Sequence, residues 1–178
     1  MLTSIPVLKT IDIMYESLVK SGHTFEYADE FEKLLLLCTQ HNRCYFDGKT
    51  YLMPDGLPMG GPLSFLMANV FMNRLEIWAL KFARFASHAL LWHRYVDDIL
   101  CFWTGTDSEL TSFLEDLNGF DPQLSFSSQI AGHNANYLDI SISLKADNIN
   151  DNLVSPEYSI FRKPQFTGVS ISNRSLHP

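Results

Sequence analysis

The stretch HRYVDDILCFW, residues 93–103, limits the possible folds more than any other part of the chain. Two apolar, β-prone runs, residues 88–95 and 99–103, lie on either side of the carboxylates Asp97 and Asp98. Short β-prone runs joined by so few residues predict an antiparallel pair of strands with the aspartates at its tip. Two ionised aspartates between buried strands repel one another and lose hydration unless a cation neutralises them.

A divalent cation would offset that repulsion. Carboxylate oxygens without nearby His or Cys partners favour Mg²⁺, or Mn²⁺, over Zn²⁺. Mg²⁺ held by few carboxylates takes its other ligands from water and substrate phosphates, so the pair indicates phosphoryl or nucleotidyl transfer. Aspartate pairs also occur in ordinary exposed turns, and that alternative stays open. The apolar runs on both sides favour the metal-binding interpretation.

The rest of the chain predicts an α+β fold with a mostly antiparallel sheet. Asp47-Gly48 is the strongest hairpin signal. Gly119 is expected to end the last helix. The predicted helices cover residues 7–18, 26–41, 63–86 and 106–118, and the predicted strands lie within 43–53, 88–95, 99–103, 124–130, 137–144 and 153–161. The side chains expected on the packed face of the second helix are Phe31, Leu34, Leu35 and Cys38.

Composition and cysteine usage indicate an intracellular protein. With 178 residues, 46% of them hydrophobic, the chain can bury a core, and we expect one domain over residues 1–178. Three cysteines without metal-ligand spacing fit a reducing compartment better than a disulfide framework. No run approaches about 20 uncharged apolar residues and the start lacks a signal-peptide pattern, so neither secretion nor membrane spanning is expected.

A formal net charge of −7 argues against a nucleic-acid partner, because phosphate binding usually comes with a basic surface. The distribution of charge weakens that argument. Acidic residues gather at 26–32, whereas the segment after Glu157 carries Arg162, Lys163 and Arg174 and no carboxylate. The sequence therefore predicts an acidic body followed by a basic tail.

A second feature is GLPMGGPLS, residues 56–64. Gly56, Gly60 and Gly61 allow close backbone approach, and the helix predicted to open at Pro62 offers free N–H groups to an anion. The alternative is a loop that needs glycine only for its turns. The stretch is neither a P-loop nor a GxGxxG fingerprint, so it identifies no ligand by itself.

Together the two features resemble reverse transcriptases. GLPMGGPLSFLMANVFMNRLE followed by RYVDDIL resembles motifs B and C of these polymerases, and MLTSIP resembles the tail of motif A. NYLDISI and SIFRKPQFTGVSISNRSLHP are similar to the segments that follow in Penelope-like retroelements, whose polymerase is related to telomerase. The resemblance covers nearly the whole chain. It implies a polymerase palm-type antiparallel sheet with packed helices and RNA-directed DNA polymerase activity.

The resemblance also implies roles for individual residues. Asp97 would be the metal-binding carboxylate of motif C, with Asp98 as its partner, acting through Mg²⁺ or Mn²⁺ on the 3′-hydroxyl of a DNA primer. Tyr95 would lie beneath the primer terminus. Arg162 and Lys163 match a basic motif near the primer-holding region, and as surface charges they would equally contact phosphate. The residues implied to border the incoming dNTP and the RNA template are Met59, Gly60, Gly61, Pro62 and Ser64.

The chain departs from the family in ways that bear on activity. The family commonly has MGSPLSP where this chain has MGGPLSF, so Gly61 replaces a serine and Phe65 a proline. The sequence lacks the motif A aspartate that would precede MLTSIP, and it lacks the thumb, so we expect an incomplete palm. Two-metal catalysis requires carboxylates from separate strands.

Three functions remain open. The first is a reverse transcriptase palm fragment, for which an RNA-dependent RNA polymerase is the nearest rival. The second is an inactive retroelement remnant or a nucleic-acid-binding fragment, because the motif A aspartate is absent. The third is an unrelated interaction domain in which the aspartate turn is incidental. A nuclear location would follow only from the life cycle of a retroelement.

Overall fold

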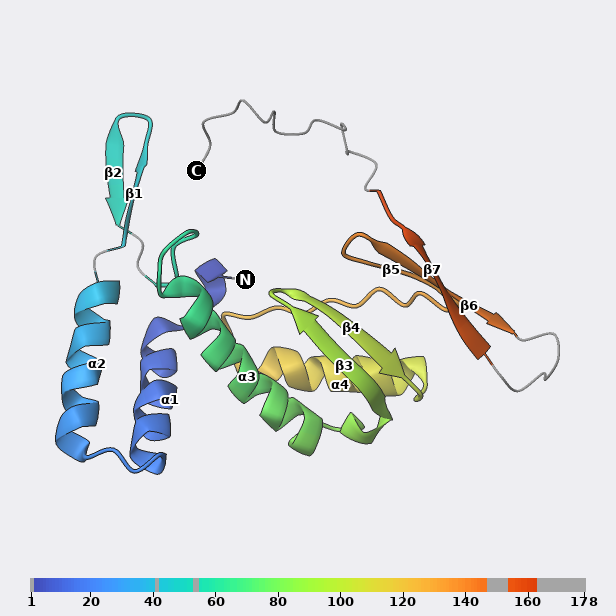
Figure 1. Cartoon of the computed structure of the whole chain (residues 1–178), viewed down its shortest axis with the longest axis horizontal. Helices are drawn as coiled ribbons and strands as arrows, with labels where there is room; N and C mark the ends of the chain where they lie inside the picture. Colours follow the sequence, from blue (N-terminus) through green and yellow to red (C-terminus); the bar gives the residue numbers. More distant parts are fainter. Residues whose placement is uncertain (1, 41, 53–54, 147–153, 163–178) are drawn as a thin grey trace. The chain divides into compact units, whose positions relative to one another are not determined.

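The chain forms two compact units, residues 1–128 and 129–178, in a computed structural model that describes residues 2–40, 42–52, 55–146 and 154–162. Within these ranges four α-helices and three small antiparallel sheets confirm the α+β class. None of the helices in these ranges has the length and hydrophobicity that a membrane span requires. The first unit contains η1 (Leu2–Ser4), α1 (Val7–Lys20), α2 (Phe25–Thr39), β1 (Arg43–Phe46), β2 (Lys49–Leu52), α3 (Ser64–Phe82), η2 (Ala86–His88), β3 (Ala89–Tyr95), β4 (Asp98–Trp103) and α4 (Asp107–Phe120). The second contains β5 (Asn134–Tyr137), β6 (Ile140–Ala146) and β7 (Val154–Ile160) (Figure 1).

α3 supplies much of the core of the first unit. Its buried side chains recur at helical spacing and join a core that includes Ile11 of α1 and Phe113 of α4. The helix ends at Phe82 rather than near 86, because Ala83 has extended backbone. The buried apolar residues of α3 are Met67, Ala68, Phe71, Met72, Leu75 and Ala79.

α2 packs through a different set of side chains from the one that the sequence predicted. It runs alongside α1 (Figure 1), and the two helices contact one another. Ala28 and Leu35 are buried, and Phe31 packs against the core. Leu34 is 55% exposed and Cys38 is exposed, so their expected place on the packed face was wrong.

Both hairpins of the first unit have two-residue turns. In the β1–β2 turn Asp47 and Gly48 have φ of 48° and 73°, as a type I′ turn requires. β3 and β4 pair antiparallel with Tyr95 opposite Asp98. The hairpins predicted at Asp47-Gly48 and at the aspartate pair are therefore confirmed.

α4 begins with the predicted capping box. The Thr106 side chain accepts a hydrogen bond from the Glu109 N–H, and the Glu109 carboxylate accepts one from the Thr106 N–H at 2.7 Å. The helix continues through Gly119 to Phe120, so the expected end at Gly119 was wrong. Phe120 packs against Trp78, with ring centroids 5.1 Å apart, and this contact holds the last residues of the helix.

The strand predicted at 124–130 is absent, and this segment has irregular backbone. The Asn118 side chain of α4 accepts a hydrogen bond from the Phe126 N–H at 2.6 Å and donates one to the Phe126 carbonyl at 3.1 Å. The side chain of Leu124 is buried in the core. The segment is therefore held by a helix, and its backbone groups are not paired in a sheet.

The second unit is a three-stranded antiparallel sheet in the order β5-β6-β7. The run 137–144 is not one strand, because Leu138 and Asp139 form a turn between β5 and β6, with Leu138 at φ 55°. The strand predicted at 153–161 is confirmed as β7. Alternate residues place apolar side chains on one face and polar ones on the other. The apolar face carries Ala135, Tyr137, Ile140, Ile142, Leu144, Pro156, Tyr158 and Ile160.

Candidate functional site

The Asp97-Asp98 pair lies at the tip of the β3–β4 hairpin. Val96 and Asp97 are the two turn residues, and Asp98 begins β4 opposite Tyr95. Both aspartates are exposed, and neither makes a side-chain hydrogen bond or ion pair within the described part of the chain. Val96 has φ of 57°, a left-handed conformation that is strained for a β-branched residue. Backbone strain of this kind clusters at functional sites, so it supports a role for this turn.

The aspartates are not desolvated, so one premise of the metal-binding prediction was wrong. The sequence predicted buried strands on both sides, but β3 and β4 form a two-stranded sheet with one covered face. Trp92 and Arg94 lie on the face that packs on the helices. His93, Tyr95 and Phe102 lie on the other face and are exposed. Burial therefore requires no cation here, and repulsion between adjacent carboxylates is the remaining reason for one.

Arg94 fastens the aspartate turn to α3. Its guanidinium donates to both carboxylate oxygens of Glu76, at 2.8 and 3.2 Å, and to the side-chain oxygen of Asn69 at 3.0 Å. The same group donates to the carbonyl oxygen of Val96, within the turn, at 3.3 Å. The Trp92 Nε1 also donates to Glu76 at 2.9 Å. The Arg94 and Glu76 side chains are only 11% and 15% exposed, so water screens the pair weakly.

α3 connects this turn to the glycine-containing loop, residues 56–64. Asn69 lies five residues after Ser64, the first residue of α3, which is about 8 Å along a helix axis. The Ser64 side chain is buried, and its hydroxyl donates to the carbonyl oxygen of Pro58 at 2.6 Å. This bond holds the loop at the start of the helix. The two sequence features therefore belong to one connected part of the first unit.

The glycines of the loop differ in their surroundings. A Cβ on Gly56 would lie 2.2 Å from the backbone carbonyl oxygen of Thr3. A Cβ on Gly61 would lie 2.6 Å from Ser64 Oγ, so a larger residue such as serine would not fit here without a shift of the loop. Gly60 has φ of 83° and faces open space. Close packing therefore explains Gly61, backbone conformation explains Gly60, and both explain Gly56, which has φ of 89°.

Asp55 holds the loop to α1, a role that the sequence did not reveal. One carboxylate oxygen accepts from the backbone N–H of Gly56 at 2.8 Å and of Val7 at 3.1 Å. The other accepts from Gln123 Nε2 at 2.7 Å. Partial burial acts to raise the pKa of Asp55, but the hydrogen bonds from Gln123, Gly56 and Val7 outweigh it and lower that pKa below its ordinary value. Local sequence signals cannot identify Val7 as a partner, because it lies 48 positions away.

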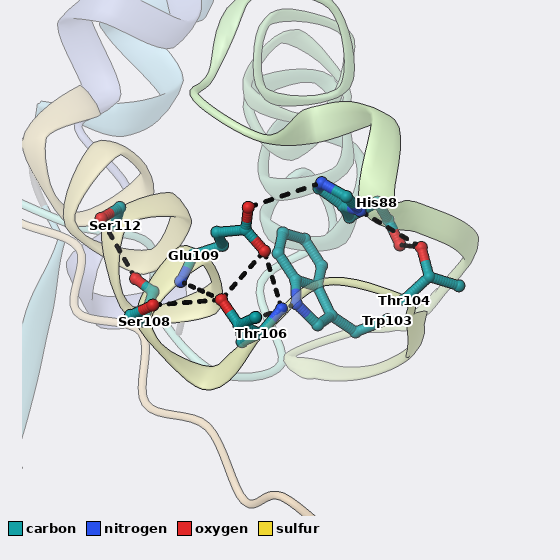
Figure 2. A network of polar contacts seen from close by, with 7 residues as sticks. All are labelled: His88, Trp103, Thr104, Thr106, Ser108, Glu109 and Ser112. Carbon is teal, nitrogen blue, oxygen red and sulfur yellow. Dashed lines mark hydrogen bonds and ion pairs between the residues drawn. The ribbon is translucent and has the colours of Figure 1, made fainter.

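A polar cluster fastens the other end of the β3–β4 hairpin to α4 (Figure 2). The Trp103 Nε1 donates to the carbonyl oxygen of Thr106 at 3.3 Å, and the Thr106 hydroxyl donates to Glu109 at 2.9 Å. His88 Nε2 lies 3.9 Å from the other oxygen of Glu109, and the Thr104 hydroxyl donates to the His88 carbonyl. Hydrogen bonds from Thr106 hold the pKa of Glu109 below its ordinary value. The hairpin is thus held by α3 near its turn and by α4 near its base.

The predicted site residues of the loop fall into an exposed tip and a packed base. Met59 is 77% exposed, and Gly60 is exposed beside it. Gly61 and Ser64 form the packed base. The expectation that Pro62 opens the helix was wrong, because α3 begins at Ser64 and Pro62 precedes it.

The remaining predicted residues lie in two places. Asp97, Asp98 and Tyr95 share the tip of the β3–β4 hairpin, with Asp97 in the turn and Tyr95 and Asp98 in the strands beside it. Arg162 follows β7 in the second unit, and Lys163 lies outside the described residues. Their suggested contact with a primer stays a prediction. Arg94, which anchors the turn, was missed, although a charged residue inside an apolar strand is a usable sequence signal.

The aspartate turn fits part of a metal site. Two adjacent carboxylates are hard oxygen ligands of the kind that Mg²⁺ takes, with water and phosphate as its other ligands. No group of three or more His, Cys, Asp or Glu side chains is placed to hold a metal ion in the described part of the chain. Asp97 and Asp98 therefore fit the ligands that a single turn contributes to a metal site. A two-metal site needs a further carboxylate from another strand.

Comparisons of the chain with protein-family models, with curated proteins and with solved structures gave no significant match. The function is accordingly argued from the residues of the site itself.

Proposed function

We propose that the chain is part of the palm of an RNA-directed DNA polymerase, the reverse transcriptase of a Penelope-like retroelement. The observation that supports this most is the contact of Arg94 with both Asn69 and Val96. It joins the aspartate turn to the helix that follows the glycine-containing loop. The resemblance to motifs B and C requires these two segments to be neighbours, whereas an incidental aspartate turn does not.

In this proposal Asp97 and Asp98 bind Mg²⁺, and the substrates are an RNA template, a DNA primer and dNTPs. The ion would stabilise negative charge on the reacting phosphate and favour deprotonation of the primer 3′-hydroxyl. The chain's own contribution is to position the carboxylates. Arg94 holds the turn against α3, and the exposed tip at Met59 and Gly60 borders the incoming nucleotide.

A second candidate is a nucleic-acid-binding fragment without catalytic activity, or an inactive retroelement remnant. Asp97 and Asp98 both lie at one exposed hairpin tip, whereas two-metal catalysis uses carboxylates from separate strands, and this observation favours the second candidate. This candidate shares the nucleic-acid partner of the first and differs in the chemistry.

Metal binding at the turn is the first test. Mn²⁺ binding, measured by electron paramagnetic resonance, should weaken at least about tenfold in Asp97→Asn, because one of two ligands loses its charge. Asp139→Asn is a matched control. Like Asp97, Asp139 is the second residue of a two-residue hairpin turn whose first residue, here Leu138 at φ 55°, is left-handed, but no second carboxylate is adjacent to it. Equal Mn²⁺ affinity of the wild-type chain and Asp97→Asn would contradict a metal site here.

Primer extension separates the two candidates. The assay uses an RNA template, a DNA primer, dNTPs and Mg²⁺, with this chain and with any longer product of the same gene. Extension that Asp97→Asn abolishes supports the polymerase. Template binding without extension by any of the folded proteins supports the second candidate.

A further inference from the structure

The β1–β2 hairpin exposes large aromatic side chains. Every residue of both strands is exposed, and Tyr45, Phe46 and Tyr51 are 75%, 72% and 46% exposed. Phe46 is opposite Lys49 and Tyr51 is opposite Cys44, so these four residues share one face. Phe46 and Tyr51 occupy diagonal positions on that face, within reach of one another. Neighbouring exposed rings of this size indicate a surface for a partner.

The hairpin is also basic within an acidic chain. Lys49 lies directly opposite Phe46, and Arg43 lies at the start of β1. The two strands contain no carboxylate, and Asp47 lies in the turn between them, whereas the whole chain has a net charge of −7. A negatively charged partner is therefore complementary to the strands. A polyanion with flat apolar rings would match both the charge and the aromatic side chains.

We propose that the face formed by Phe46, Lys49 and Tyr51 binds single-stranded nucleic acid. Bases stack on aromatic side chains largely irrespective of sequence, and a neighbouring cation contacts the phosphate backbone. A four-residue strand is about 13 Å long, so the face holds a few nucleotides at a time. A duplex would not present the unstacked bases that such a face requires.

The base of this hairpin is tied to the proposed site. Asn42, directly before β1, donates from Nδ2 to the carbonyl oxygen of Gly56 at 3.5 Å. The base of the hairpin therefore lies next to the loop that leads into α3, and Tyr51 is the ring of the proposed face that is nearer to this base. The choice of nucleic acid as the partner, and of the template as the bound strand, rests on the proposed function. The binding itself can be measured separately from polymerase activity.

Fluorescence anisotropy of the full 178-residue chain with a labelled RNA or DNA strand of about 12 nucleotides tests the proposal. The buffer contains EDTA and no dNTPs, so neither metal binding nor catalysis contributes. We expect Phe46→Ala and Tyr51→Ala each to raise Kd about 5- to 100-fold. We expect Lys49→Gln to reduce the slope of log Kd against log salt by about 0.7.

Matched variants control for exposure, charge and folding. Phe82→Ala on α3 removes a ring that is 73% exposed, close to the 72% of Phe46, and Lys81→Gln removes an equal charge beside it. Neither should change Kd by more than about twofold. Phe46→Trp keeps an aromatic ring at the site and should retain wild-type affinity, with circular dichroism confirming the fold of every variant.

The outcomes distinguish this inference from the proposed function. Hairpin-dependent binding together with no primer extension, by this chain or by any longer product of the same gene, would leave the inference standing and contradict the polymerase. Wild-type binding by Phe46→Ala and Tyr51→Ala, or no binding by the wild-type chain, would overturn the inference even if extension occurs. A dimer that Phe46→Ala disrupts, without nucleic-acid binding, would also overturn it and assign the face to a second copy of the chain.

Discussion

Gly56 and Gly60 share a left-handed backbone, with φ of 89° and 83°, but have different neighbours. Gly60→Ala should cost about 1 kcal/mol, the strain of placing a Cβ in this conformation. Gly56→Ala should cost about 3 kcal/mol, because its Cβ would also overlap the backbone of Thr3. Urea unfolding of both variants measures the difference. Equal losses would mean that the contact with Thr3 does not constrain the loop.

Asp55 should make stability depend on acid pH. The pKa of Asp55 in the folded chain is below the ordinary value of about 3.9. The ionised carboxylate therefore stabilises the fold above that pH, and this stabilisation is lost as the pH falls through the folded pKa. Asp55→Asn should be less stable than the wild type by about 1 kcal/mol at pH 7, allowing for solvent screening of a partly exposed carboxylate. The difference in unfolding free energy should be smaller at a pH below about 3.9 than at pH 7. If urea unfolding gave the same difference in free energy between the wild type and Asp55→Asn at both pH values, the hydrogen bonds to Asp55 would not depend on its charge.

At the scale of single residues, the sequence revealed what depends on local pattern and missed what depends on distant contacts. The capping pair Thr106 and Glu109 is recognisable because its two members are three residues apart. Asp55 and Arg94 are not recognisable as anchors in the same way, because their partners belong to other elements. The exposure of Asp97 was also missed, since apolar flanking residues do not reveal how many faces of a hairpin are covered.

The contact between β3 and α3 depends on the shielded ion pair of Arg94 with Glu76. Glu76→Ala should cost about 3 kcal/mol, because it leaves the Arg94 charge and the Trp92 N–H without their shared acceptor. Glu115→Ala is the matched control, since Glu115 also pairs with an arginine, Arg84, but is 64% exposed. It should cost less than about 1 kcal/mol. Urea unfolding checks both values, and similar losses would show that burial does not set the strength of the pair.

At the scale of elements, periodicity predicted every α-helix of the first unit and turn signals predicted both of its hairpins, but not every predicted strand was confirmed and neither 3-10 helix was predicted. The segment 124–130 has β-prone residues, yet Asn118 binds its backbone at Phe126 and leaves it irregular. The run 137–144 alternates like one strand, and the turn at Leu138-Asp139 interrupts it. Tertiary contacts and an unusual turn residue override propensity in these two cases.

For the whole molecule, the position of the core predicts which part of the chain is independently stable. Among the described residues, every member of the main buried cluster lies within 1–128. A protein of residues 1–128 should therefore keep the urea midpoint and the helical circular dichroism of the first unit. Loss of cooperative unfolding on this truncation would show that the second unit is required for the core. The assignment of residues 1–178 to one partial polymerase domain stays a prediction, because length, composition and resemblance do not reveal how a core is divided.

Val96 has a consequence for how a ligand would meet the turn. Its left-handed backbone, the hydrogen bond from Arg94 and the paired strands on both sides leave the aspartate tip few alternative conformations. The tip is thus preorganised, and little conformational entropy remains to be lost when an ion or phosphate binds. Val96→Gly would relieve the backbone strain but allow the tip more conformations. The substitution would therefore weaken the binding of an ion or phosphate without an equal loss of folding stability.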